Sequence, residues 1–211
     1  MTKKQSDLLD FVRLVVDGDV HEVSRRLAAN PALATAQAEV GATRRRATDF
    51  FFPGIAHYLY TGDTALHMAA AAFRRQLAEL LIERGADWRM KNRRGAQPLH
   101  YAADTNRWEP AAQADTIRYL LAVGADPNSV DRSGVSPLHR AVRTRSSPAV
   151  RALLEGGANP TAPNRSGTTA LQLAVKATGR GGSGSQHAHE QQAAIIRLMR
   201  ERGAHLHAKK G

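Results

Sequence analysis

The sequence contains no cysteine in its 211 residues. This absence excludes disulfide bonds, cysteine-based zinc sites and thiol catalysis within the chain, and it fits a cytoplasmic protein. The sequence also lacks any run of about 18 apolar residues, so we expect no membrane-spanning helix. The N-terminal stretch MTKKQSDLLDF has no apolar core of a secretory signal, so none is predicted.

Aromatic and acidic residues are both scarce. Aromatics make up 5% of the chain, and 19 acidic residues face 30 Lys and Arg, for a net charge of +11. A basic balance favours acidic protein surfaces, nucleic acid or anionic small molecules as partners, although it also fits a generally arginine-rich composition. With 42% hydrophobic residues, the chain can form one domain over residues 1–211.

The chain repeats a helical pattern. TALHMAA, QPLHYAA, SPLHRAV and TALQLAV start 33, 39 and 33 residues apart, at residues 64, 97, 136 and 169. A second series, RGAD, VGAD, GGAN and RGAH, follows an apolar pair in each unit. In SPLHRAV, Ser136 can cap a helix and Pro137 suits its first turn. The glycines of the second series can end a helix in the left-handed conformation: Gly85, Gly124, Gly157 and Gly203.

These three elements, recurring in order, resemble the ankyrin repeat. The resemblance implies an all-α solenoid of stacked helix-turn-helix units joined by short hairpins, in which each unit buries its apolar face against the next. It also implies that His67, His100 and His139 hydrogen-bond between neighbouring repeats. About five units are expected: 6–40 as a degenerate N-terminal cap, an insert at 41–60, then 61–94, 95–133, 134–166 and 167–207 as the C-terminal cap.

The segment TGRGGSGSQHAHEQ at 178–191 contains a literal G-x-G-x-x-G. A helical pattern rather than a strand precedes it, and no G-K-[ST] follows, so neither a dinucleotide fingerprint nor a P-loop is predicted. It reads as an enlarged loop between two helices, serving as a flexible insert or as an anion-binding backbone nest with Arg180. His187 and His189 lie two residues apart, which does not suit one helix face, and no metal or cofactor is expected.

The resemblance implies that a partner binds a concave face formed by hairpin tips and first helices. Three successive predicted tips carry arginine at one position, Arg93, Arg132 and Arg165, with Arg94 beside the first. The ends of first helices carry Asp104, Arg143 and Lys176. The row either reflects the ordinary polarity of turns or forms a binding surface. The second alternative is supported by the guanidinium fork of arginine, which suits carboxylate and phosphate groups.

The insert at 41–60 holds five of the eleven aromatics and Arg44, Arg45 and Arg46. It either covers the end of the stack or contacts a partner, and both hold if its phenylalanines cover the stack while Tyr60 and these arginines stay exposed. It could also lean over the loops near 104–110, 143–147 and 178–190. That arrangement would form a pocket with six residues on its walls: Tyr60, Asp104, Trp108, Arg143, Arg145 and Arg180.

Three functions follow, in order of preference. The first is a monomeric, non-enzymatic module that binds an acidic protein through the basic concave face. The second is binding or catalysis with a small anionic molecule in the composite pocket, where Asp104, His57 and Tyr58 would be the reactive groups. The third is non-specific nucleic-acid binding, which the charge favours but no recognised motif supports.

Arg140 stands at a position that the family usually keeps apolar, and its expected partner is Asp104 or Asp131.

Overall fold

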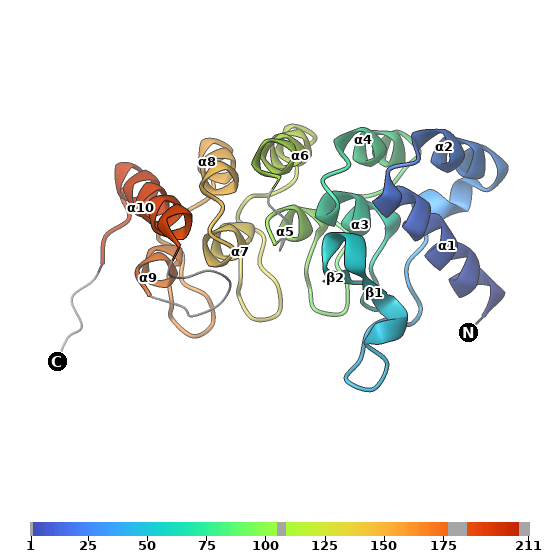
Figure 1. Ribbon diagram of the computed structural model, residues 1–211, viewed down its shortest axis with the longest axis horizontal. Coiled ribbons are helices and arrows are strands. Elements are labelled where there is room, and N and C mark those ends of the chain that lie inside the picture. Colours follow the sequence, from blue (N-terminus) through green and yellow to red (C-terminus); the bar gives the residue numbers. More distant parts are fainter. Residues whose placement is uncertain (1, 105–108, 177–184, 207–211) are drawn as a thin grey trace.

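The computed structural model describes residues 2–104, 109–176 and 185–206. Ten helices in these residues form two parallel rows (Figure 1), with α1 and α10 at opposite ends of the molecule. The first row holds one helix of each repeat: α1 (Lys3–Asp17), α3 (Ala65–Ala71), α5 (Pro98–Ala102), α7 (Pro137–Arg143) and α9 (Ala170–Val175). The second row holds the other: α2 (Val20–Ala29), α4 (Arg75–Glu83), α6 (Pro110–Ala122), α8 (Ser147–Glu155) and α10 (Gln186–Glu201).

Neighbouring helices of each row pack against one another, so a single apolar core runs the length of the molecule. Leu66, Leu99, Leu138 and Leu171 occupy the same place in successive first helices and are all buried. Small alanines beside them, such as Ala69 and Ala102, let the helices approach closely. The predicted all-α solenoid is confirmed, and a pair of two-residue strands is a minor addition.

The capping pattern predicted for SPLHRAV is present at α7. Ser136 Oγ accepts a hydrogen bond from the backbone N–H of His139, and Pro137 fills the first turn of α7. His139 Nδ1 in turn accepts the backbone N–H of Ser136 at 3.3 Å. The four glycines that follow the second helices have φ between 82° and 100°, as the left-handed helix end requires.

The three histidines join repeats, as the resemblance implied. The Nε2 atoms of His67, His100 and His139 lie 3.2, 3.1 and 3.1 Å from the carbonyl oxygens of Ala96, Val135 and Thr168 in the next hairpin. Because a carbonyl only accepts, each Nε2 carries the proton and each Nδ1 acts as an acceptor within its own capping box. Each imidazole therefore ties its helix start to the following repeat.

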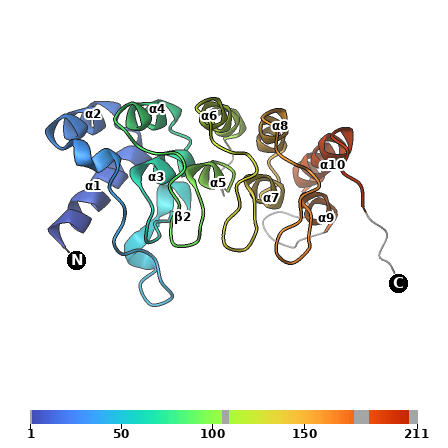
Figure 2. The ribbon, with the colours of Figure 1, turned by 180° about the vertical axis from the view of Figure 1, so that it is seen from behind.

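The insert forms a small folded segment. Two 3₁₀ turns, η2 (Thr48–Phe50) and η3 (Pro53–Ile55), flank β1 (Phe51–Phe52), which pairs antiparallel with β2 (His57–Tyr58). A further 3₁₀ turn, η1 (Pro31–Ala34), follows α2. Figures 1 and 2 place the insert beside α1 and α3, at the side where the hairpins project. The insert therefore lies along the stack, and its η3 turn packs against α1.

Candidate functional site

The side of the molecule formed by the hairpins and the first helices is called the hairpin face below. On it, successive hairpin tips are joined by backbone hydrogen bonds. Arg132 N donates to Arg94 O at 2.9 Å, and Arg165 N donates to Ser133 O at 3.1 Å. The first tip is held in the same way, with Arg93 N 2.9 Å from Thr61 O. The predicted tip arginines therefore stand in a row, one per repeat, and all are exposed.

The tips approach one another closely, which explains their glycines. Gly134 has φ of 71°, and a Cβ placed on it would lie 2.7 Å from Arg165 N. A Cβ on Gly95, where φ is 76°, would lie 3.0 Å from Arg132 N. Only glycine both adopts this backbone conformation and leaves room for the next tip.

Tyr60, at the end of the insert, lies against the first of these tips. The guanidinium carbons of Arg93 and Arg94 lie 5.7 and 4.8 Å from the centre of its ring, which is the geometry of a cation–π contact. Arg93 also donates from Nη2 to Ala42 O at 2.6 Å. The expectation that Tyr60 is exposed was wrong, because these two arginines and the stack half-bury it.

A shallow groove runs between the insert and the tips, with a volume of about 480 Å³. We call it the arginine groove. Its four basic residues are Arg44 from the insert and Arg93, Arg94 and Arg132 from the tips. Tyr58, Tyr60, Ala42, Thr43 and Ala47 complete its lining.

A second, smaller hollow adjoins the arginine groove and shares Tyr58, Tyr60 and Arg94 with it. We call it the tyrosine pocket; it measures about 170 Å³. Its remaining polar walls are His57, Asn92, Tyr101, Asp104 and Arg140. The insert therefore lies against the hairpin tips, and Tyr60 and Asp104, two of the six residues predicted for the composite pocket, line the same hollow.

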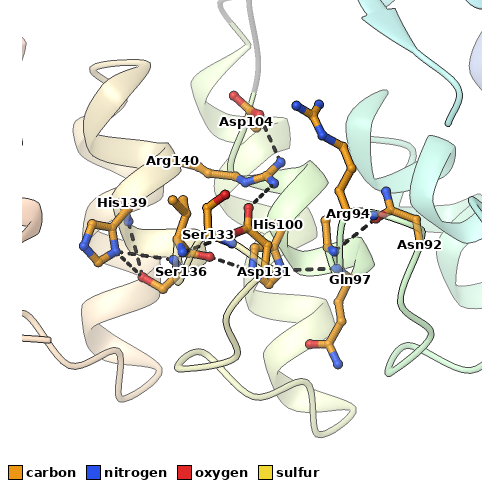
Figure 3. Close-up of polar contacts among 12 residues, drawn as sticks. Asn92, Arg94, Gln97, His100, Asp104, Asp131, Ser133, Ser136, His139 and Arg140 are labelled. Atoms are coloured by element: carbon orange, nitrogen blue, oxygen red, sulfur yellow. Dashed lines mark hydrogen bonds and ion pairs between the residues drawn. The ribbon is translucent and has the colours of Figure 1, made fainter. Parts of the chain in front are cut away.

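Arg140 stands at the far wall of this pocket and joins two repeats. Its Nη1 lies 3.0 Å from Asp104 Oδ2 and its Nη2 lies 3.0 Å from Asp131 Oδ2. Figure 3 shows its side chain extended between the two carboxylates, with Arg94 on the neighbouring hairpin. Burial opposes the charge of Asp104, but Arg140 and Arg143 outweigh it and hold its pKa below the usual value. Arg140 therefore pairs with both of the carboxylates that the sequence suggested as alternatives, Asp104 and Asp131.

His57 differs from the three repeat histidines. Its Nδ1 lies 3.0 Å from Tyr58 O, so Nδ1 carries the proton and Nε2 is left as an acceptor. Burial lowers the pKa of His57, so the ring is neutral near pH 7. Its ring centre lies 4.6 Å from that of Tyr101. The pocket thus offers a neutral acceptor on one wall and the Arg94 guanidinium on another.

A buried polar network beneath the pocket was not predicted from the sequence. Asp63 is fully buried and accepts from Tyr60 N at 2.6 Å, Asn92 Nδ2 at 2.8 Å and the Tyr101 hydroxyl at 2.8 Å. Burial and the Asp63 charge raise the Tyr101 pKa well above its ordinary value, so the phenol stays protonated. The only sequence signal was Tyr101 itself, at a position that holds Met68 in the repeat before and Arg140 in the repeat after.

Arg143 and Arg145 were also predicted for the composite pocket but do not line the tyrosine pocket. Arg143 donates to Asp104 Oδ1 at 2.9 Å but, with Arg145, lines a separate hollow of about 20 Å³ beside Leu173. Trp108 and Arg180 lie outside the described residues, as does most of the glycine-rich stretch. The proposed loop 178–190 was too long, because Ser185 caps α10 and residues from Gln186 onward are helical.

Two of the three phenylalanines of the insert cover the stack. Phe50 and Phe52 are buried in the common core, whereas Phe51 remains 38% exposed.

Among the described residues, no group of three or more His, Cys, Asp or Glu could hold a metal ion. In the same part of the chain, no helix is long and apolar enough to cross a membrane.

Stacked helix pairs with an exposed row of hairpin tips define a repeat solenoid. The sequence profile described as ankyrin repeats (3 copies) matches residues 51–131 and 109–209. The chain therefore belongs to the ankyrin-repeat family, and ankyrin repeats indicate a protein–protein interaction module.

Three curated proteins illustrate the similarity. E3 ubiquitin-protein ligase KEG of Arabidopsis thaliana is 41% identical over 81 residues, which are 38% of this chain and 5% of that protein. Probable E3 ubiquitin-protein ligase XBOS31 of Oryza sativa subsp. japonica is 36% identical over 100 residues, 47% of this chain and 18% of that protein. Putative ankyrin repeat protein FPV022 of Fowlpox virus (strain NVSL) is 38% identical over 52 residues, 25% of this chain and 8% of that protein. The chain thus spans less than a fifth of each relative.

Proposed function

We propose that this ankyrin-repeat chain is a non-enzymatic module that binds an acidic partner protein through its hairpin face. The observation that carries the proposal is the row of exposed tip arginines, Arg94, Arg132 and Arg165, held in register by backbone hydrogen bonds between hairpins. In the described part of the chain, no ion pair involves these three side chains, so their charges are available to a partner.

The physical chemistry of arginine supports this choice of partner. A guanidinium presents a planar fork that matches a carboxylate, and each desolvated hydrogen bond to a charged group contributes about 1.5–3 kcal/mol. The net charge of +11 also attracts acidic surfaces over a distance, which speeds association and makes it sensitive to salt.

The test compares two triple variants with the same change in net charge. Arg94→Glu, Arg132→Glu and Arg165→Glu alter the hairpin face, while Arg118→Glu, Arg151→Glu and Arg200→Glu alter exposed positions on the second helices. Arg93 is left intact because it holds Ala42. Both variants must unfold at the temperature of the unmodified chain.

Affinity capture from lysate at two salt concentrations is the measurement. We expect the hairpin-face variant to lose a protein that the unmodified chain and the control variant both retain, and high salt to weaken that capture. Equal capture by the two variants would refute the role of the hairpin face. Capture of nucleic acid in place of protein would favour the third function predicted from the charge.

A second candidate function is the binding of a small anionic molecule in the tyrosine pocket. The observation in its favour is the enclosure of about 170 Å³ between the insert and Arg140, with Arg94 and the His57 Nε2 acceptor on its walls. A ligand that binds only the folded state raises the melting temperature. A thermal-shift screen of anionic metabolites, repeated with Arg94→Gln, tests this candidate, and no shift with any compound would reject it.

A further inference from the structure

The arginine groove concentrates positive charge more than any other hollow described above. Its lining holds four arginines, Arg44, Arg93, Arg94 and Arg132, and includes no Asp or Glu among the described residues. The two sides of the groove come from different parts of the chain, the insert and the hairpin tips. An insert that only covered apolar surface would not need to present Arg44 across from these tips.

Contacts already present hold the arginines of the tips in place. Arg93 is fixed by its bond to Ala42 O and by the Tyr60 ring, and Arg94 lies 4.8 Å from the centre of the same ring. The backbone of Arg132 is held by its bond to Arg94 O. Because the side chains of Arg93 and Arg94 and the backbone of Arg132 are pre-positioned, less conformational entropy is lost when an anion binds.

Acidic side chains close to the groove have other partners. Asp49 of the insert pairs with Arg46, with Oδ2 3.0 Å from Nε. Asp104 pairs with Arg140 and Arg143, and Asp63 is buried among hydrogen-bond donors. No described carboxylate of the chain therefore neutralises the groove.

We infer that the arginine groove binds a phosphorylated side chain of the acidic partner segment, an inference that rests on the proposed function. A carboxylate carries one charge and two oxygens, and would leave most of this cluster uncompensated. A phosphate monoester carries a charge of about −1.5 to −2 and three acceptor oxygens, which several guanidinium groups can share. The neighbouring tyrosine pocket, which shares Tyr60 and Arg94, lies where the next side chain of such a segment would enter.

Peptide arrays with randomised flanks provide the test. Each array fixes one central residue: phosphoserine, phosphotyrosine, glutamate or unmodified serine. We expect a phosphorylated array to bind roughly tenfold more tightly than the glutamate array, the effect of about one additional hydrogen bond to a charged group. Inorganic phosphate should compete with this binding.

Two single variants provide matched controls. Arg132 and Arg165 occupy the same tip position in successive repeats, but only Arg132 lines the groove. Arg132→Gln should abolish the preference for phosphate, and Arg165→Gln should preserve it. Arg94→Lys, which keeps the charge and loses the fork, should weaken the preference as well.

The outcomes separate this inference from the proposed function. Equal binding of the phosphorylated and glutamate arrays, lost in the hairpin-face triple variant, would overturn phosphate recognition and leave the acidic-partner function standing. An equal effect of Arg132→Gln and Arg165→Gln would overturn the groove as the site. Binding to none of the arrays would overturn the inference, and the capture experiment alone would then decide the proposed function.

Discussion

Arg140, in the fourth repeat, reaches across to Asp104 at the end of α5 in the third repeat, with Nη1 3.0 Å from Oδ2. The same guanidinium binds Asp131 in the hairpin between them. Only 10% of the Arg140 side chain is exposed. A buried cation thus holds a helix end, a hairpin and the following helix together at the wall of the tyrosine pocket.

Replacement of Arg140 by methionine should therefore destabilise the stack. The substitution keeps the aliphatic part of the side chain but leaves Asp131 without its cation, and removal of one member of a buried pair typically costs about 3–5 kcal/mol. Asp104 would retain Arg143, so we expect the free energy of unfolding, measured in urea, to fall by about 3 kcal/mol.

Arg143→Ala is the matched comparison. Arg143 binds the same carboxylate of Asp104 at 2.9 Å, but its side chain is 52% exposed. Solvent screens such a pair, so the loss should stay below about 1 kcal/mol. Similar losses for Arg143→Ala and Arg140→Met would show that burial does not set the strength of these ion pairs.

The sequence predicted features that recur and missed features that occur once. The left-handed glycines and the row of tip arginines follow from the period, because each is repeated at a fixed position, and the role of the histidines follows from the family resemblance. The bond between Tyr101 and Asp63 spans 38 residues and joins one repeat to the start of the repeat before it. No periodic signal reports such a contact, so the buried position of Asp63 could not be inferred.

The candidate site shows the same division. The tip arginines were selected because they recur in each repeat, and Tyr60 because it belongs to the insert, which departs from the repeat. The structure brings Tyr60 and the predicted Asp104 to one pocket. Arg143 and Arg145 were included because their loop was expected on the same edge. The structure instead places both beside Leu173 of the next repeat, where Arg143 also binds Asp104, since the direction of a side chain cannot be read from its spacing.

The insert's phenylalanines should contribute unequally to stability. Phe50 is 1% exposed and Phe51 is 38% exposed, although the two are adjacent. We expect Phe50→Ala to cost about 3 kcal/mol or more through lost burial and a cavity. Phe51→Ala should cost about 1 kcal/mol, mainly from its ring contact with Tyr58 at 4.8 Å.

Thermal and urea unfolding of the two phenylalanine variants measure this difference. The partner-binding experiment should be repeated on Phe51→Ala, because an exposed aromatic on the hairpin face is also a candidate contact. Equal destabilisation by the two changes would mean that the insert is not anchored through Phe50.

Two glycines in successive hairpins separate backbone strain from close approach. Gly134 and Gly167 both have φ of 71°, so alanine is strained equally at each, by about 1 kcal/mol. At Gly134 the added Cβ would also lie 2.7 Å from Arg165 N, whereas at Gly167 it meets no described atom within 4 Å. Gly134→Ala should therefore cost about 2–3 kcal/mol, and Gly167→Ala about 1 kcal/mol.

Chemical denaturation gives both values for these alanine variants. Gly134→Ala should also speed hydrogen exchange at Arg165 N, because the bond from this group to Ser133 O at 3.1 Å must lengthen. Unchanged exchange at Arg165 would argue against the tight stacking of the tips.

Acid should weaken the stack before its carboxylates are protonated, because the repeat histidines are held neutral. Burial, together with the nearby Arg140 charge, lowers the pKa of His100 to about 3, and burial also lowers the pKa of His67 and His139. In the unfolded chain a histidine titrates near pH 6.5. Below that pH the unfolded state takes up protons that the folded state does not, so the free energy of unfolding falls.

His100→Gln tests this origin of acid sensitivity, because Gln172 already occupies the equivalent place in α9. The backbone N–H of Gln172 lies 3.2 Å from Thr169 Oγ, and its Oε1 lies 2.9 Å from Thr169 N. The variant loses the bond to Val135 O and should be about 1 kcal/mol less stable at pH 7.5. Between pH 6.5 and 4.5, His100 should contribute a fall of about 1.4 kcal/mol per pH unit, which the variant removes. Asp104 and Asp131, whose pKa values are lowered, lose their contribution only below about pH 3.8, outside this window. An unchanged pH slope of the unfolding free energy in the variant would show that His100 is protonated in the folded stack.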